Sequence, residues 1–171
     1  RAGLSLMNNA SYLTGFNDIT NIEWMWGSRI ITETTPFFYQ FHSFMGTNFN
    51  GSAVKTQPKA INSLLWDALP ATDIRKKCWI QNGTLATVQA GIPWNPAPAG
   101  NGYSYIQYHM KKFWLSDLTA NVGDVPMMRV AEMYLIEAEA RARQGGQDVA
   151  ARAALFSLLT NRNPSYVLST N

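Results

Sequence analysis

The chain has 171 residues, of which 46% are hydrophobic and 15% are charged, a composition typical of one globular domain of ordinary size. It has no apolar run near the roughly 20 residues of a membrane-spanning helix. Its net charge is only +3, and the Lys and Arg residues are scattered except for Arg75-Lys76-Lys77 and Lys111-Lys112, which argues against a nucleic-acid-binding protein. A single cysteine, Cys78, excludes an internal disulfide, and with two distant histidines, His42 and His109, it cannot form a zinc site.

The first 60 residues lack helical periodicity because glycine, proline and asparagine interrupt them repeatedly. Weak alternation predicts a short strand over Ile22–Trp26 and another over Arg29–Thr32. Phenylalanines recur at a helix-like spacing within residues 36–49, which favours a short helix or a turn there.

A better helix is predicted from Pro58 to Leu69, because proline is well tolerated in a first turn and Pro70 follows as a stop. Its apolar face consists of Ile61, Leu64, Leu65 and Ala68. Asp73 then opens a short segment that runs to Trp79.

Residues 81–104 are rich in turn signals and form a predicted loop of about 24 residues. A loop of this length is either a binding loop or a decoration specific to the protein, and the sequence leaves both open. Residues 103–114 carry a mixed pattern that suggests extended structure.

The clearest prediction is a helical hairpin over residues 124–164. Asp124 and Val125 lead into Pro126, placed at or near the first position of a helix, and Gly145-Gly146 ends that helix. Asp148 is expected to cap a second helix, which Pro164 stops. The apolar faces are Val130, Ala131, Tyr134, Leu135, Ala138 and Ala142 on the first helix, and Val149, Ala150, Ala153, Ala154, Phe156 and Leu159 on the second.

Glu137 with Arg141, and Glu139 with Arg143, are i, i+4 pairs in the favourable order. The short connection makes the two helices antiparallel neighbours, and their many alanines permit close approach, as in a tetratricopeptide hairpin. One such hairpin cannot bury its faces alone. Because the chain also starts at Arg1 without a signal peptide, we expect a fragment of a larger protein.

The stretch from Asp124 to Ala140 contains an Asp and a Pro, then Arg129, Ala131-Glu132, Leu135 and Ala138-Glu139-Ala140. This pattern resembles the SusD/RagB family, as do the glycine turn, the alanine-rich helix and Arg162 that follow. Weaker similarities upstream are Asn21-x-Glu23, Asp73-x-Arg75 and Lys112-Phe113, so the resemblance spans about residues 21–162. The acidic and Arg-rich helix and the aromatic motif expected after the hairpin do not occur in this chain.

The resemblance implies a mainly α fold with a tetratricopeptide-type hairpin, long irregular loops and a few short strands. Residues 1–171 would then be part of a single SusD/RagB-like domain, with a loop-rich, aromatic-rich region over 1–123. It also implies a bacterial cell-surface protein of the outer membrane, lipid-anchored in its full-length form although the anchor is absent here. The implied partners are a glycan or oligosaccharide and a TonB-dependent transporter, with no nucleic acid.

No catalytic motif is found, and no cofactor or metal is expected. The carboxylates of Glu132, Glu137 and Glu139 lie on a regular helix with arginine partners, which favours a solvated face over an acid–base pair. We therefore expect a protein that is not an enzyme.

Ligand binding is expected to use aromatic side chains outside the helices, because a flat ring beside an amide can stack on a sugar. The candidates are Trp94 with Asn95 in the long loop, and Trp24, Trp26, Tyr39 and Trp66. Core packing is the competing interpretation of each. Peptide cargo, or a helical scaffold without a small ligand, remain alternatives to glycan.

Overall fold

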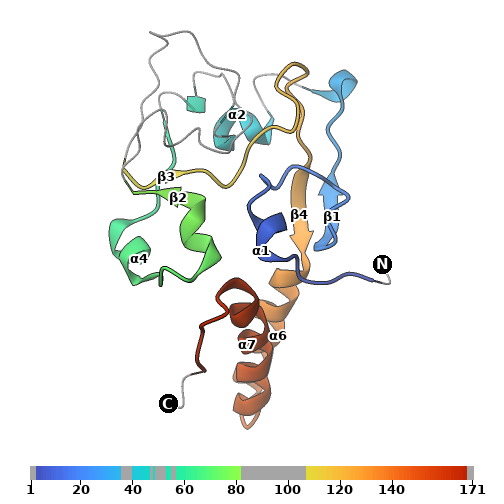
Figure 1. Ribbon diagram of the computed structural model, residues 1–171. Helices are drawn as coiled ribbons and strands as arrows, with labels where there is room; N and C mark the ends of the chain where they lie inside the picture. The colour runs from blue at the N-terminus through green and yellow to red at the C-terminus, as the bar shows by residue number, and fades with distance from the viewer. Residues whose placement is uncertain are drawn as a thin grey trace.

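The computed structural model describes residues 3–35, 40–46, 48, 53–54, 57–81 and 107–168. These residues are mainly helical and include two small sheets, which confirms the expected fold class (Figure 1). In chain order the elements are α1 (Asn9–Tyr12), β1 (Trp24–Ser28), the 3-10 helix η1 (Thr32–Thr34), α2 (Phe41–Met45), α4 (Ser63–Ala68), the 3-10 helix η2 (Ile74–Cys78), β2 (Trp79–Ile80), β3 (His109–Met110), β4 (Val125–Arg129), α6 (Val130–Gln144) and α7 (Asp148–Arg162).

Helices α6 and α7 form the expected hairpin, which projects from the rest of the chain (Figure 1). Gly145 and Gly146 make the turn, and both have positive φ angles, of 70° and 66°. The two predicted ion pairs are present, with Nε–Oε1 distances of 2.9 Å for Arg141–Glu137 and 2.8 Å for Arg143–Glu139.

The start of the hairpin differs from the prediction, because Pro126 lies in strand β4 and α6 begins only at Val130. β4 pairs antiparallel with β1, with Pro126 opposite Gly27 and Arg129 opposite Trp24. Proline is compatible with this strand because a two-stranded sheet has only edge strands, where a missing N–H donor costs little. The fixed φ of proline suits a strand as well as a first helical turn.

Helix α7 also differs from the prediction. Asp148 is its first residue rather than its cap, since Gln147 occupies the cap position without a side-chain hydrogen bond. The buried face is formed by Ala151, Ala154 and Leu158, whereas Val149 is 85% exposed. Alanines are so frequent in this helix that several faces fit the periodicity, and contact with α6 selects one of them.

Two other predicted elements change their bounds. The helix expected over Pro58–Leu69 is limited to α4, because Asn62 accepts a hydrogen bond from the Leu64 N–H and caps the helix there. Residues 29–32 form no strand; the chain leaves β1 at Ser28 and turns into η1. Residues 82–104 of the loop predicted over 81–104 lie outside the described residues, as do residues 36–39, 47 and 49 of the aromatic segment 36–49.

The main hydrophobic core lies between α1, β1 and η2. It comprises Met7, Tyr12, Phe16, Trp24, Ile74 and Cys78. Tyr12 and Phe16 meet edge to face with ring centroids 5.0 Å apart, and Phe113 packs against Phe16 from the segment before β4. This core joins parts of the sequence that are about a hundred residues apart, and it places the β1–β4 sheet beside η2.

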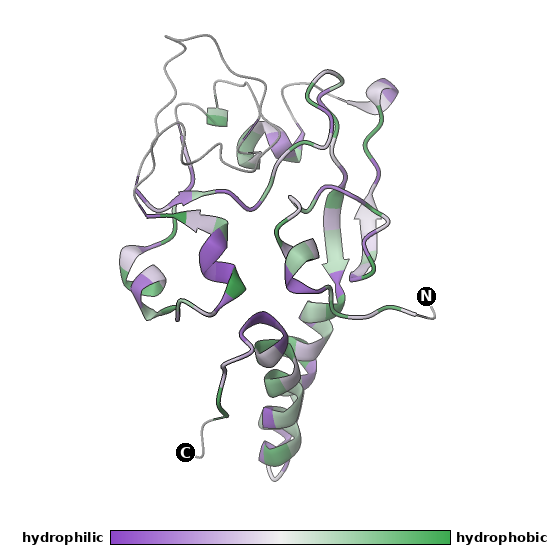
Figure 2. Cartoon of the chain, viewed as in Figure 1, coloured by the Kyte–Doolittle hydropathy of each residue, from purple (hydrophilic) through white to green (hydrophobic). Residues whose placement is uncertain are grey.

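Apolar residues recur along both helices of the hairpin, as the green stretches of α6 and α7 in Figure 2 show, and some of them are exposed. Leu135 and Ile136 are 49% and 52% exposed. None of the helices among the described residues is long and apolar enough to cross a membrane.

Candidate functional site

A buried carboxylate, Glu23, ties the hairpin to the rest of the fold. Its Oε2 accepts hydrogen bonds from Arg162 Nη2 at 2.5 Å and from the Met7 N–H at 2.8 Å, and its Oε1 accepts one from Arg129 Nη1 at 3.2 Å. Arg162 also donates to the Met7 carbonyl at 2.7 Å. Glu23 comes from the segment before β1, Arg129 from the end of β4 and Arg162 from the end of α7, so one anion holds three elements together.

Two other acidic residues have similar structural roles. The Asp124 carboxylate accepts hydrogen bonds from the backbone N–H groups of Ile19 and Ile30. It thus connects the two segments that flank β1. Asp73 caps η2 and forms a bidentate ion pair with Arg75. Glu23, Asp73 and Asp124, three acidic residues of the segments that resemble the family, therefore stabilise the scaffold through protein partners.

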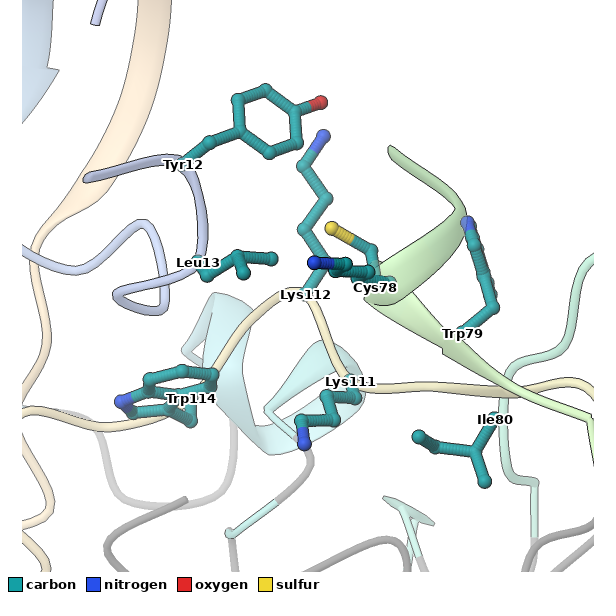
Figure 3. A pocket seen from close by; sticks show the side chains of 9 residues that line it. Tyr12, Leu13, Cys78, Trp79, Ile80, Lys111, Lys112 and Trp114 are labelled. Atoms are coloured by element: carbon teal, nitrogen blue, oxygen red, sulfur yellow. The ribbon is translucent and has the colours of Figure 1, made fainter. Parts of the chain in front are cut away.

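A cleft of about 440 Å³ lies between α1 and the η2–β2 segment (Figure 3). We call it the lysine cleft, and its walls are Tyr12, Leu13, Lys77, Cys78, Trp79, Ile80, Lys111, Lys112 and Trp114. Figure 3 shows Lys112 between Tyr12 on one side and Cys78 on the other, with Trp114 and Trp79 on opposite walls. A smaller cavity of about 270 Å³ shares Tyr12, Cys78, Trp79 and Lys112 with it.

Backbone hydrogen bonds hold the segment 111–114 between the two walls. The Lys111 N–H donates to the Cys78 carbonyl at 2.8 Å, and the Trp114 N–H donates to the Gly15 carbonyl at 3.2 Å. Gly15 has a φ of +102°, and a Cβ there would lie 2.5 Å from the Trp114 ring, so only glycine fits. The position of Trp114 in the cleft thus depends on a glycine 99 residues earlier in the chain.

The electrostatics of the lysine cleft follow from burial. Burial lowers the pKa of Lys112 to about 8, and repulsion by Arg129 acts in the same direction. Burial also lowers the pKa of Lys111 and raises the pKa of the Cys78 thiol to about 11. At neutral pH Lys112 is therefore still mostly protonated and the Cys78 thiol is un-ionised, so the cleft carries positive charge and no thiolate nucleophile.

The predicted ligand residues are dispersed. Trp24 is 1% exposed and packs in the core, so we do not carry it forward as a stacking platform. Trp26 is 61% exposed on the sheet, opposite Met128. Trp66 is half-buried, with Lys76 Nζ 3.9 Å from the centre of its ring. Trp94, Asn95 and Tyr39 lie outside the described residues.

Trp79, Trp114 and the lysines of the cleft were not predicted as ligand residues. The Arg75-Lys76-Lys77 and Lys111-Lys112 runs were visible in the sequence as the two basic clusters. Nothing in the sequence indicates that the two clusters meet, because that depends on the pairing of β2 with β3. In the part of the chain that the structure describes, no group of three potential metal ligands is found.

Comparison with known proteins identifies the family. The family model described as the SusD family matches residues 28–159. The chain belongs to the SusD family.

A solved structure supports this membership. The crystal structure of a SusD-like carbohydrate binding protein from Bacteroides vulgatus ATCC 8482 superposes with a TM-score of 0.72 and 27% sequence identity, over 98% of this chain and 32% of that one. The chain thus spans about a third of the length of that protein. No curated protein matches the chain.

Proposed function

We propose that the full-length protein containing this chain captures a glycan at the bacterial cell surface and passes it, chemically unchanged, to a TonB-dependent transporter of the outer membrane. The observation that carries this proposal is the alignment of nearly the whole chain with a SusD-like carbohydrate binding protein. A lipid anchor outside this chain would hold the protein at the membrane.

The lysine cleft supports the same proposal. Trp79, which is half-buried, provides a flat indole ring, and the lysine ammonium groups of the cleft can donate hydrogen bonds to sugar oxygens. No carboxylate lines the cleft within the described ranges, so its walls offer no acid–base pair of the kind that glycosidases use. Binding without turnover is the chemistry that this arrangement favours.

The test is affinity electrophoresis of the full-length protein through gels that contain single polysaccharides. Retardation by at least one polysaccharide is expected, with no release of reducing sugar. Three variants locate the site: Trp79→Ala for the cleft, Trp26→Ala for the exposed sheet face and Trp94→Ala for the long loop. Tyr166→Ala removes an aromatic ring that packs on Phe156 of α7 and serves as the matched control. Lack of retardation by every polysaccharide, with binding of peptides instead, would replace glycan by peptide as the cargo.

Delivery to a transporter is tested separately. The protein, purified in mild detergent from cells grown on the retained glycan, is expected to bring down a TonB-dependent transporter. If the protein is recovered alone under conditions that preserve other outer-membrane complexes, the delivery step is wrong while glycan capture can still hold.

A further inference from the structure

The polar side chains of the lysine cleft are almost all hydrogen-bond donors. Lys77, Lys111 and Lys112 only donate, and so do the indole N–H groups of Trp79 and Trp114. Tyr12 brings the only hydroxyl among the described lining residues. A neutral sugar presents hydroxyl groups that both donate and accept, so it is best matched by a mixture of donors and acceptors. A ligand rich in acceptors fits this wall better.

Two carboxylates that act electrostatically on the cleft, Glu23 and Asp73, are paired with arginines. Glu23, which acts electrostatically on Lys112, is bound by two arginines. Asp73, on the η2 side, is bound by Arg75 at 2.6 Å. Both carboxylates therefore pair with arginines, and Glu23 leaves Lys112 able to bind an anionic group of a ligand.

Aromatic rings hold the central ammonium group in place. Lys112 Nζ lies 4.7 Å from the ring centre of Phe16, 5.1 Å from that of Phe113 and 5.8 Å from that of Tyr12. Such contacts stabilise a cation in a partly buried position without using its hydrogen-bonding capacity for a carboxylate. The ammonium group is thus held by aromatic rings in a cleft that Trp79 also lines, where a sugar ring can stack.

Building on the proposed function, we infer that the glycan bound in this cleft is acidic, and carries carboxylate or sulfate groups on its sugar rings. The sugar ring stacks on Trp79, the half-buried indole of the cleft, and its anionic group accepts hydrogen bonds from Lys77, Lys111 or Lys112. Charge-assisted bonds of this kind are about twice as strong as neutral ones, so they would dominate the selection among glycans.

The experiment compares three classes of polysaccharide in affinity gels with the full-length protein: neutral (dextran and xyloglucan), uronate-containing (polygalacturonate and alginate) and sulfated (chondroitin sulfate). Poly-glutamate, which is anionic but has no sugar ring, is the fourth arm. The test variant is Lys77→Gln with Lys111→Gln, which spares Lys112 and its aromatic contacts. The matched control is Arg29→Gln with Arg152→Gln, which removes two exposed positive charges that do not line the cleft.

Retardation by a uronate or sulfated polysaccharide, weakened about tenfold or more by the cleft variant and little changed by the control, is the expected result. The uronate and sulfate arms decide which anion is preferred. Binding of neutral polysaccharide alone, unaffected by the cleft variant, would overturn the inference and leave glycan capture standing. Equal retardation by poly-glutamate would overturn it in favour of charge attraction without sugar recognition. Failure of every polysaccharide to bind would overturn both proposals.

Discussion

Glu23 shows at the residue scale why a family motif can be conspicuous without being a binding site. Its side chain is completely buried and shared by Arg129 and Arg162, the second of which is 2% exposed. A buried carboxylate between two guanidinium groups adds little net stability by itself, but removal of one partner leaves uncompensated buried charge. The motif is thus a requirement of the fold.

Glu23→Gln is expected to lower the free energy of unfolding by about 3–5 kcal/mol, because it leaves Arg162 buried beside a neutral amide. Chemical denaturation of the full-length protein measures the change. Glu33→Gln is the matched control, since Glu33 is exposed in η1, and its effect should stay within about 0.5 kcal/mol. A Glu23→Gln variant as stable as the parent would show that the three-element junction does not depend on this charge.

His42 gives the protein a predicted sensitivity to acid. It is fully buried, neither ring nitrogen has a hydrogen-bond partner, and burial lowers its pKa to about 4, although Asp124 acts in the opposite direction. Below the ordinary histidine pKa of about 6.5, the unfolded chain takes up a proton that the folded chain does not. Stability therefore falls between about pH 6.5 and about pH 4, and this contribution is constant below that range.

The expected loss from His42 between about pH 7 and about pH 5 is about 2 kcal/mol. His42→Leu should make the pH dependence shallower by about this amount and change stability at neutral pH little, because no hydrogen bond is lost. Burial also lowers the pKa of His109, so some pH dependence will remain. Urea unfolding at the two pH values measures the free energy of unfolding of the parent and of the variant. Parallel curves for parent and variant would contradict the assignment to His42.

The residues that hold the fold together could be recognised in the sequence as family motif positions, but their contacts could not. Glu23 and Arg162 are 139 residues apart, and no local pattern relates them. Asp124 was expected to open a helix, whereas its carboxylate accepts two backbone hydrogen bonds from distant segments. Local periodicity reports on neighbours in the chain, and these contacts are set by tertiary packing.

At the scale of elements, the hairpin was the best predicted part because its signals are local. Alanine-rich periodicity, i, i+4 ion pairs and a double glycine all act within one turn or one loop. The helix start predicted at Pro126 was wrong because β1, which lies far earlier in the chain, pairs with these residues and holds them in strand β4. The sheet partner of β4 lies about a hundred residues earlier in the chain, so strand pairing, and not local propensity, makes residues 125–129 extended.

Gly145→Ala tests the turn of the hairpin. Gly145 combines a φ of 70° with a ψ of 146°, which an L-residue rarely adopts, although a Cβ there would meet no atom within 4 Å. The cost is therefore conformational, and we expect a loss of about 1–3 kcal/mol in the free energy of unfolding. Gln144→Ala, an exposed substitution one residue earlier, should change stability by less than about 0.5 kcal/mol. Equal stability of the two variants would show that the turn relaxes.

At the scale of the whole molecule, the hairpin has an exposed apolar face. The hairpin buries Ala151, Ala154 and Leu158 between its helices yet exposes Leu135 and Ile136. Tetratricopeptide-type hairpins bury such faces by stacking on neighbouring hairpins, and this chain covers 32% of the related crystal structure. That the chain forms one part of a single larger domain stays a prediction.

The high aromatic content was visible in the sequence, but which aromatic side chains are exposed was not. Of the predicted ligand residues, Trp24 is core, Trp26 is exposed and Trp66 is half-buried. The lysine cleft depends on two basic clusters brought together by β2 and β3, a pairing of only two residues in each strand. Strands this short leave almost no alternation in the sequence, and the cleft they create was therefore missed.

The most direct test of the account is a calorimetric titration of the full-length protein with an oligosaccharide of the glycan that it retains. Trp79→Ala is expected to weaken binding about tenfold, because it removes the indole ring on which the sugar stacks, and a loss of about 1.4 kcal/mol corresponds to a factor of ten. Trp79→Phe should recover part of the lost affinity. Thermal unfolding of each variant verifies that the fold is intact. Unchanged affinity in a folded Trp79→Ala variant would contradict the assignment of glycan capture to the lysine cleft.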